Sequence, residues 1–560
     1  MDTARAIVAR LNGIFCLPSV LFSLALSVAL VIGRSFFLTN GLFFIFGSFG
    51  AIARAAGRAL LYFLILSVLS ALLMRWLNSD RGRLRDSISA PTKQILGLFM
   101  GETWRTPVVL GATIFTCWVP CMLAYWPGMY SYDIGGILPQ GTYGPYNSIQ
   151  PLLYTLFVKA IYWIARGGGT AGGMLGVAIT QMAILSAIYA VVIWRLNRLR
   201  VHLLLRWLGL IWFALYPSIA IFTIAETKDG LFAGVFALTT VFLLELARDP
   251  ALFFKTALRP VSLSGLMVLL CLLRNNGAWM LLLLIVAVIA QHRTWKEVFK
   301  QMLMAIGSAF VVGFSVTQIL LPAIGVRGFS RVMFSVPIQQ IAYTHKVDAP
   351  NLDKSDRNVI YNWIQADIDN DYNPRYADPM MLYSRDVDLS PRTFEFLKTW
   401  LHVGLTHPAE YTEAFLTLTL QTWYPGSAFP DQYAQKPYIE TENYPESGVV
   451  RQSKAPILLD LYQSVAIEAT WQHIPVVSLL FDTATPLWFM LFGIALLVKR
   501  KQRREMIVFL LPLALLATIL LGPSFNGRYM LPFFVSFPIW LVALLSKTVS
   551  TDERDGSSTE

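Results

Sequence analysis

The chain has 560 residues, of which 55% are hydrophobic and 14% are charged. This composition, a mean hydropathy of +0.55 and recurring apolar runs of about 20 residues exclude a set of soluble domains and predict an all-α, polytopic membrane protein. The formal net charge of +11 does not indicate a nucleic-acid-binding protein. The basic residues instead gather in short loops between the apolar runs, as they do in the cytoplasmic loops of membrane proteins.

We expect about twelve transmembrane helices with both termini in the cytoplasm. The orientation rests on the basic loops RWLNSDRGRLRD, RLNRLRVHLLLR and KRKQRR, which the positive-inside rule places in the cytoplasm. The predicted spans cover residues 13–33, 57–76, 106–126, 172–194, 207–225, 230–247, 261–273, 277–290, 303–322, 484–499, 505–522 and 529–546.

The chain divides into five predicted regions. Residues 1–104 form an N-terminal two-span extension with a basic cytoplasmic loop, and residues 105–322 form a core with the first large outer loop. Residues 323–482 form a long extracytoplasmic region, residues 483–546 form three closing spans, and residues 547–560 form a disordered tail.

Two apolar pieces are expected to lie along the outer interface rather than to cross the membrane. One covers residues 34–56, and the other is the run IQPLLYTLFVKAIYWIARGGG, residues 149–169, which Lys159 interrupts. A transmembrane assignment of either piece would invert the basic loops that follow it.

The stretch LAYWPGMYSYDIGGILPQ, residues 123–140, follows the third predicted span and contains Asp133 with its neighbour Tyr132. Asp133 is the only charged residue between Arg105 and Lys159. Simple solvation or capping of the next helix explains such a carboxylate as well as catalysis does. Because no cation is adjacent in the sequence, we expect Asp133 to keep the basicity of a general base.

Three further polar turns are expected on the same outer face. The turns AETKDG, LLRNNG and NGRY contribute Glu226, Lys228, Asp229, Arg274, Asn275 and Arg528. Acids at a helix start also favour the macrodipole, and an arginine at the start of a span also snorkels. Arg274 is harder to explain structurally, because an arginine at a helical break inside a membrane needs an anionic partner.

Together these groups suit a reaction in which a hydroxyl loses its proton and an anionic group departs. Carboxylates supply the base, and arginine and lysine stabilise phosphate oxygens as their charge grows. A site of this kind on the outer face fits the headgroup of an anionic lipid.

The order of YSYD, IQPLLYTLFVKAIYWIARGGG and MLGVAITQMAILSAIYAVVIW resembles the GT-C class of integral-membrane glycosyltransferases. The set WPGMYSYD, AETKDG, LLRNNG, FSVPIQQIA, THPAEYTEAFLTLTLQTWYPG and NGRYMLPF is similar to a family of bacterial multi-pass proteins grouped with that class, over residues 105–546. The resemblance implies a GT-C-like fold, a polyprenyl-phosphate-linked sugar donor and an active site on the outer face of a bacterial inner (plasma) membrane.

The resemblance also implies roles for individual residues. Asp133 matches the outer-loop aspartate of the class, which implies a general base in an inverting sugar transfer to an envelope glycan, lipopolysaccharide or glycolipid acceptor. Glu226 or Asp229 falls where a second acid is often found. Gln150 stands where the class often has histidine or proline, so no role is assigned there. Members differ in metal dependence, so neither the presence nor the absence of a divalent metal is predicted.

Other assignments rest on chemistry alone. Lys228, Arg274 and Arg528 are expected to hold the donor phosphate, with Asn275 beside them. Gln339 and Gln340, in the motif SVPIQQIA, are expected to hydrogen-bond sugar hydroxyls.

Two rival functions remain open from the sequence. About twelve spans is also typical of a secondary transporter or a flippase for a glycolipid or sugar, although transporters often show paired halves with matching broken helices. The predicted split into nine spans and three spans lacks such pairing. A non-catalytic scaffold for envelope assembly is the third alternative.

Overall fold

The computed structural model describes residues 16–79, 82–85, 94–426, 447–467, 470–525 and 527–547. The first 15 residues and the predicted tail beyond Lys547 lie outside this range. Within the described ranges the fold is all-helical apart from two short strands, β1 (Leu84–Arg85) and β2 (Ser546–Lys547), which pair in parallel. This pair joins the predicted cytoplasmic loop of the N-terminal extension to the end of the last membrane helix.

The described residues contain seven helices that are long and apolar enough to cross a membrane, so the chain is a polytopic membrane protein. The seven are α2 (Leu17–Thr39), α4 (Phe49–Asn78), α6 (Arg105–Ala124), the helix Arg166–Arg198 containing α9 (Gly169–Arg198), α12 (Lys228–Arg248), the helix Phe299–Ala323 containing α17 (Phe299–Phe314), and the helix Gly527–Leu545 containing α31 (Leu531–Phe534) and α32 (Phe537–Leu545). A bent pair, α10 (Leu203–Leu215) with α11 (Pro217–Ile224), makes an eighth candidate.

The remaining four predicted spans coincide with shorter helices of 13 to 16 residues. These helices are α14 (Leu258–Leu273), α15 (Gly277–Ala290), α29 (Thr485–Lys499) and α30 (Ile507–Ile519). The count of twelve spans therefore stays a prediction. The run expected at the outer interface forms α8 (Leu152–Ile164), a 13-residue helix that starts directly after Pro151.

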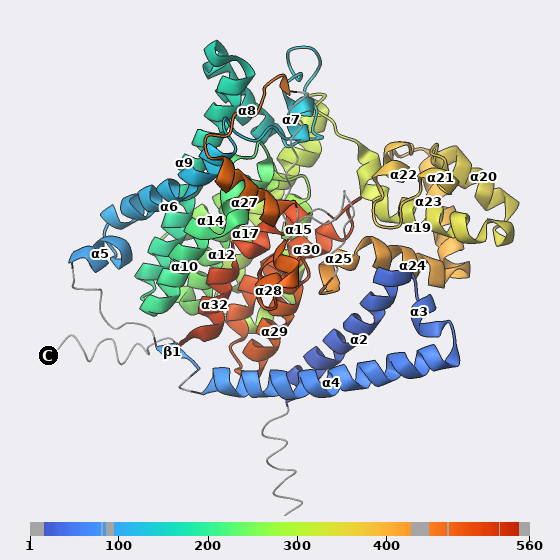
Figure 1. The fold of residues 1–560 in the computed structure, drawn as a ribbon, viewed down its shortest axis with the longest axis horizontal. Coiled ribbons are helices and arrows are strands. Elements are labelled where there is room, and N and C mark those ends of the chain that lie inside the picture. Colours follow the sequence, from blue (N-terminus) through green and yellow to red (C-terminus); the bar gives the residue numbers. More distant parts are fainter. Residues whose placement is uncertain are drawn as a thin grey trace, which may run out of the picture.

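Helix α12 lies at the centre of the membrane bundle, packed against α9, α14, α30 and α31 (Figure 1). Nearly all of its side chains are buried. Thr227 begins the helix, because its Oγ1 accepts a hydrogen bond of 3.0 Å from the backbone N–H of Asp229. At 1.5 Å per residue its 21 residues span about 31 Å, so its two ends lie near opposite faces of a membrane.

The predicted helical break at Arg274 is present. Arg274 has an extended backbone (φ −150°, ψ 129°) between α14 and α15. Gly277 closes the turn by donating its N–H to the carbonyl oxygen of Arg274 over 2.9 Å. A Cβ atom at Gly277 would stand 2.6 Å from the Cα of Cys271, so glycine permits this close approach. A second break, of 47°, separates α10 from α11, where Pro217 begins the new helix.

The N-terminal extension differs from the prediction in its helix boundaries. The second span, expected over residues 57–76, is a 30-residue helix that starts at Phe49. Ser48 caps this helix by accepting a hydrogen bond from the N–H of Ala51 over 3.1 Å. Because α2 continues to Thr39, the apolar connection expected over residues 34–56 shrinks to a short turn around α3 (Phe43–Phe46). Helix α2 packs against α4 and α29.

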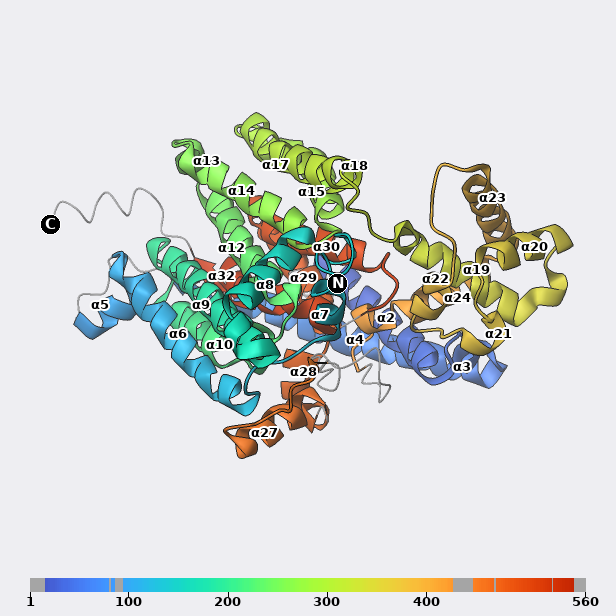
Figure 2. The same ribbon diagram turned by 90° about the horizontal axis from the view of Figure 1, so that it is seen from above.

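The long region expected outside the membrane forms two pieces. Six helices share a hydrophobic core of their own and lie to one side of the bundle, and we call them the outer helical domain (Figures 1 and 2). They are α19 (Ser335–Asp348), α20 (Lys354–Trp363), α21 (Ile368–Asp371), α22 (Asp378–Leu382), α23 (Pro391–Thr406) and α24 (Pro408–Leu418). The second piece contains α27 (Pro456–Ala466), which packs against membrane helix α6.

Candidate functional site

Two loops from different parts of the core run side by side and build one half of the site. The backbone N–H of Met129 donates to Ile224 over 3.2 Å, and the N–H of Glu226 donates to Met129 over 3.1 Å. Ser131 adds a hydrogen bond from its Oγ to the carbonyl oxygen of Glu226, at 2.8 Å. This pairing holds α7 (Tyr132–Ile137) beside the start of α12.

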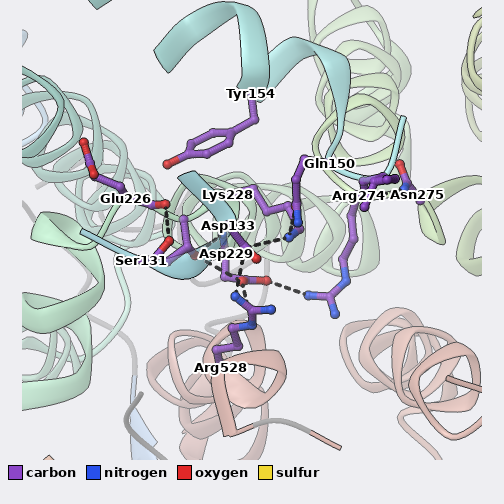
Figure 3. A network of polar contacts seen from close by, with 12 residues as sticks. Ser131, Asp133, Gln150, Tyr154, Glu226, Lys228, Asp229, Arg274, Asn275 and Arg528 are labelled. Atoms are coloured by element: carbon purple, nitrogen blue, oxygen red, sulfur yellow. Dashed lines mark hydrogen bonds and ion pairs between the residues drawn. The ribbon is translucent and has the colours of Figure 1, made fainter. Parts of the chain in front are cut away.

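Five of the residues singled out in the sequence meet at this point (Figure 3). Asp133 Oδ2 lies 3.2 Å from Lys228 Nζ and 2.9 Å from Arg528 Nη1. Asp229 Oδ1 lies 3.0 Å from Arg274 Nη1, and its Oδ2 lies 3.5 Å from Arg528 Nε. We call these five residues the ionic cluster. Their side chains come from the first outer loop, the start of α12, the break after α14 and the turn before α31.

The ionic cluster is buried and nearly balanced in charge. Asp229 is fully buried, and Asp133, Arg274 and Arg528 are each at most 7% exposed. Two carboxylates face three cations, so the cluster carries one net positive charge. Buried charges of this kind are tolerated when they are paired. An additional anion would complete the balance.

The cations around Asp133 overturn the expectation that this carboxylate keeps the basicity of a general base. Burial alone would raise the pKa of Asp133, but the charges and hydrogen bonds of Lys228 and Arg528 outweigh burial and lower the pKa to about 2. No cation is adjacent in the sequence, yet the fold supplies two from distant segments. Asp133 is therefore a fully ionised, weakly basic carboxylate in this arrangement.

The loop before α8 forms one wall of the cluster. Gln150 accepts a hydrogen bond of 2.5 Å from Lys228 Nζ through its Oε1. Asn275 donates from its Nδ2 to the carbonyl oxygen of Ser148 over 2.8 Å. Gln150, for which no role is expected from the sequence, is thus a direct partner of the cluster. Its position directly before Pro151 is the only signal that could have pointed to it.

Glu226 and Asp229, the two alternatives for a second acid, occupy different environments. Asp229 belongs to the cluster, whereas the Glu226 side chain points to the other side, towards Tyr154 (Figure 3). Tyr162 donates its hydroxyl hydrogen to Glu226 Oε1 over 2.8 Å, and Oε2 has no hydrogen-bond partner among the described residues. Burial raises the pKa of Glu226 to about 8, against the lowering effect of Tyr162, so Glu226 holds a proton at neutral pH.

The two predicted glutamines hydrogen-bond within the outer helical domain. Gln339 donates from Nε2 to the carbonyl oxygen of Asn373 over 2.7 Å, and Gln340 accepts from Trp400 Nε1 over 3.1 Å. Gln340 uses both ends of its amide inside the outer helical domain, whereas Gln339 Oε1 has no hydrogen-bond partner among the described residues, and the expected role of the pair in binding sugar hydroxyls stays a prediction. Tyr132 begins α7, but its side chain lies outside the described part of the structure.

The outer helical domain brings a further acid, Asp378, near Arg528 but outside the five-residue cluster, and sequence reasoning misses it. Ala377 donates its N–H to the carbonyl oxygen of Pro523 over 2.7 Å, which docks the start of α22 beside the turn that carries Arg528. Burial raises the pKa of Asp378, and a hydrogen bond from Tyr376 and the charge of Arg528 lower it. Asp378 is 150 positions from Arg528, and nothing in its local sequence, YADPMM, indicates this proximity.

An apolar cavity of about 660 Å³ opens beside the loop before α8. Helix α8, the break between α14 and α15, and the end of the helix Phe299–Ala323 form its walls. Its lining includes Leu152, Leu156, Trp279, Val316, Leu321 and Met333. Asn275 also lines the cavity and is the chain neighbour of Arg274. The volume is typical of a ligand pocket.

The cluster does not fit a divalent metal ion. Each of its carboxylates already pairs with arginine or lysine, and a metal would add positive charge beside three cations. Among the described residues, the one group of three His, Cys, Asp or Glu ligand atoms within 4.8 Å of one another is Asp353, Asp356 and His402. That group lies on α20 and α23 of the outer helical domain and takes no part in the cluster. The donor set of the cluster instead suits an anion.

Comparison with known sequences and structures gives one match. A model described as a family of unknown function (DUF6020) matches residues 145–558, and no curated protein and no solved structure matches. The matched range contains Lys228, Asp229, Arg274 and Arg528, whereas Asp133 precedes it. Because the match covers well over half of the sequence, the chain belongs to this family of unknown function (DUF6020).

Proposed function

We propose that this protein is a GT-C-like membrane glycosyltransferase of about twelve spans. It transfers a sugar from a polyprenyl-phosphate donor to a glycan or glycolipid acceptor at the outer face of a bacterial inner membrane. The observation that carries the proposal is the buried ionic cluster, whose five residues carry one excess positive charge and whose Arg274 is the chain neighbour of Asn275 in the lining of an apolar cavity. A lipid phosphate has both features that this arrangement requires, an anionic head and a long apolar chain.

The cations of the cluster serve the leaving group. Arg274 and Arg528 present guanidinium groups from two different segments, and Lys228 presents an ammonium group between them. Arginine binds phosphate oxygens through charge-assisted hydrogen bonds, which are stronger than neutral ones. As the bond between the anomeric carbon and the phosphate oxygen breaks, negative charge grows on that oxygen, and these cations stabilise it.

Donor binding also changes the basicity of Asp133. A phosphate that approaches Lys228 and Arg528 competes with Asp133 for the same donors. Their attraction for the carboxylate falls, and the pKa of Asp133 rises from its low value. Asp133 then takes the proton of the acceptor hydroxyl, the acceptor oxygen attacks the anomeric carbon, and polyprenyl phosphate departs with inversion. Donor binding therefore precedes activation of the acceptor.

Sugar transfer by the purified protein tests the proposal. Wild type and Asp133→Asn are incubated with synthetic polyprenyl-phosphate sugars and envelope glycolipid acceptors, and products are identified by mass spectrometry. We expect transfer by wild type and a loss of about 100-fold or more in Asp133→Asn, the size typical of a lost general base. Asp460→Asn, an exposed change on α27, is the matched control and keeps the wild-type rate. A folded Asp133→Asn protein that transfers at the wild-type rate would exclude Asp133 as the base.

Transport is the second candidate, because two broken helix pairs flank the buried charges. The bent pair α10–α11 ends just before Glu226, and the α14–α15 break contains Arg274. Discontinuous helices around a charged site are typical of transporters. Vesicles that contain the protein and are loaded with labelled glycolipid distinguish the two functions. Movement of the label across the membrane without any new covalent product would replace the transferase proposal.

A further inference from the structure

The end of α12 opposite the ionic cluster carries a second charged feature. A cavity of about 440 Å³ opens there between the last turn of α12, α16 (His292–Trp295) and the turn that joins α29 to α30. Its lining contains the cations Arg248, Arg293, Lys501, Arg503 and Arg504 and the acid Glu505. We call it the basic pocket.

The side chains of three of these five cations have no ion-pair or hydrogen-bond partner among the described residues. Arg504 pairs with Glu297 at 2.9 Å, and Arg248 donates to Ser546 Oγ at 2.8 Å. The side chains of Arg293, Lys501 and Arg503 are exposed and make no ion pair or hydrogen bond with any described residue. Like charges held around one cavity repel each other unless an anion lies among them.

The backbone adds a second observation. Lys501 has a left-handed conformation (φ 61°), which is unfavourable for a residue other than glycine. Lys501 N–H donates to Val498 and Gln502 N–H donates to Leu497, so the turn after α29 is fully hydrogen-bonded. This turn presents Lys501 at the rim of the pocket even though the residue type raises its conformational energy.

We propose that the basic pocket binds the headgroup of an anionic phospholipid in the cytoplasmic leaflet, with a preference for a headgroup that carries two phosphodiesters. The pocket lies at the ends of membrane helices on the face where positive loops collect, which is the depth of lipid phosphates. Arginine forks match phosphate oxygens in pairs. The excess of cations over Glu505 exceeds what a single phosphate neutralises.

The lining favours a lipid over a soluble nucleotide. None of the nine lining residues is aromatic, so the pocket has no surface on which a base would stack. A lipid headgroup needs only the cations, because its acyl chains stay in the bilayer. Bound there, the headgroup joins the cytoplasmic ends of α12, α15 and α29 through one set of ion pairs. This inference does not depend on the reaction proposed for the opposite face.

The test uses the full-length protein in detergent. Binding of cardiolipin, phosphatidylglycerol and phosphatidylcholine is measured by native mass spectrometry and thermal shift, with inorganic pyrophosphate as the soluble competitor. We expect cardiolipin to bind most tightly and phosphatidylcholine to give no thermal shift. The variant Arg293→Gln/Lys501→Gln/Arg503→Gln changes only exposed side chains. It should bind cardiolipin about 100-fold more weakly, from about 1 kcal/mol for each cation removed.

The control variant Lys354→Gln/Arg392→Gln/Lys398→Gln removes the same charge from exposed positions of the outer helical domain and should bind cardiolipin as wild type does. Equal cardiolipin affinity in the pocket variant and wild type would overturn the proposal. Pyrophosphate binding that stabilises the protein as much as cardiolipin would also overturn it, because the pocket would then be a site for a soluble anion.

Discussion

The charged side chains at the two ends of α12 differ in their burial and in whether they are paired. At its first end the ionic cluster is buried, and every carboxylate in it touches a cation. At its last end the basic pocket is open, and five cations share one lining acid. Glu226 has no ion-pair partner among the described residues, and its raised pKa keeps it neutral instead. Burial thus requires that charge be paired or removed, whereas exposure permits an excess that is available to a ligand.

The largest expected change in stability comes from removing one ion-pair partner in the ionic cluster. Arg528→Ala removes partners of both Asp133 and Asp229 and leaves buried negative charge poorly compensated. We expect a loss of about 3–5 kcal/mol in the free energy of unfolding. Arg503→Ala in the basic pocket should change it by less than about 0.5 kcal/mol. Unfolding of both variants in detergent checks the comparison, and equal losses would remove the distinction between the two ends.

The second prediction separates the contribution of Asp133 to stability from its role in sugar transfer. Asp133→Asn leaves Lys228 and Arg528 facing a neutral amide, which we expect to cost about 2 kcal/mol. Adding Lys228→Gln should recover at least about 1 kcal/mol of this loss, because the two residues are direct partners. A double-mutant cycle measures this coupling. Additive losses would show that the ion pair contributes nothing to stability. Sugar transfer should stay as low in the double variant as in Asp133→Asn.

The third prediction concerns the effect of Glu226 on the pH dependence of stability. The folded protein keeps a proton on Glu226 up to a pKa of about 8, whereas the unfolded chain releases it near 4.5. The folded state binds more protons between these values, so this group's contribution is complete below pH 4.5 and is lost as the pH rises to 8. The slope is at most about 1.4 kcal/mol per pH unit.

Glu226→Gln should reduce the slope of the unfolding free energy against pH between pH 4.5 and pH 8. Denaturant unfolding between pH 5 and pH 8, about the window of the shift, measures the slope. Glu395→Gln, at an exposed position of α23, should leave the slope unchanged. An unaltered profile in Glu226→Gln would mean that Glu226 titrates normally in the folded protein.

The smallest expected change is in the basic pocket, at the last end of α12, and it is a gain in stability. Lys501→Gly relieves the left-handed backbone, and the greater freedom of glycine in the unfolded chain partly offsets the gain. We expect a stabilisation of about 0.5 kcal/mol, together with weaker cardiolipin binding. A variant that is both less stable and unchanged in lipid binding would contradict the role given to this turn.

The sequence predicted the fold class and the break at Arg274 because those features are local. An arginine between two short apolar runs has to leave the helix and find an anion, and Arg274 does so with Asp229, 45 residues away. The partners of Asp133 were harder to predict, since Arg528 is 395 positions distant. The opposite directions of the Glu226 and Asp229 side chains depend on where Thr227 caps α12, which no charge pattern specifies.

The features that the sequence did not predict have equally specific causes. Adjacent amides such as Gln339 and Gln340 carry no sign of whether they face a ligand or a neighbouring helix, and tertiary packing placed them in the outer helical domain. Asp378 comes near Arg528 through docking of that domain on Pro523, a contact between segments that sequence periodicity does not report. The start of α4 at Phe49 depends on the Ser48 cap within an otherwise continuous apolar stretch.

The ion-pair partners of the ionic cluster lie far apart in the sequence, so their contacts can form only in a fixed order during synthesis. The Met129–Ala225 pairing and the Asp133–Lys228 contact join segments 95 or 96 residues apart, so both can form while the second half of the chain is still on the ribosome. Arg274 emerges soon afterwards and neutralises Asp229, whereas Arg528 arrives 300 residues later than Lys228. Lys228 therefore keeps Asp133 paired through most of translation, and Arg528 completes the site as one of its last steps.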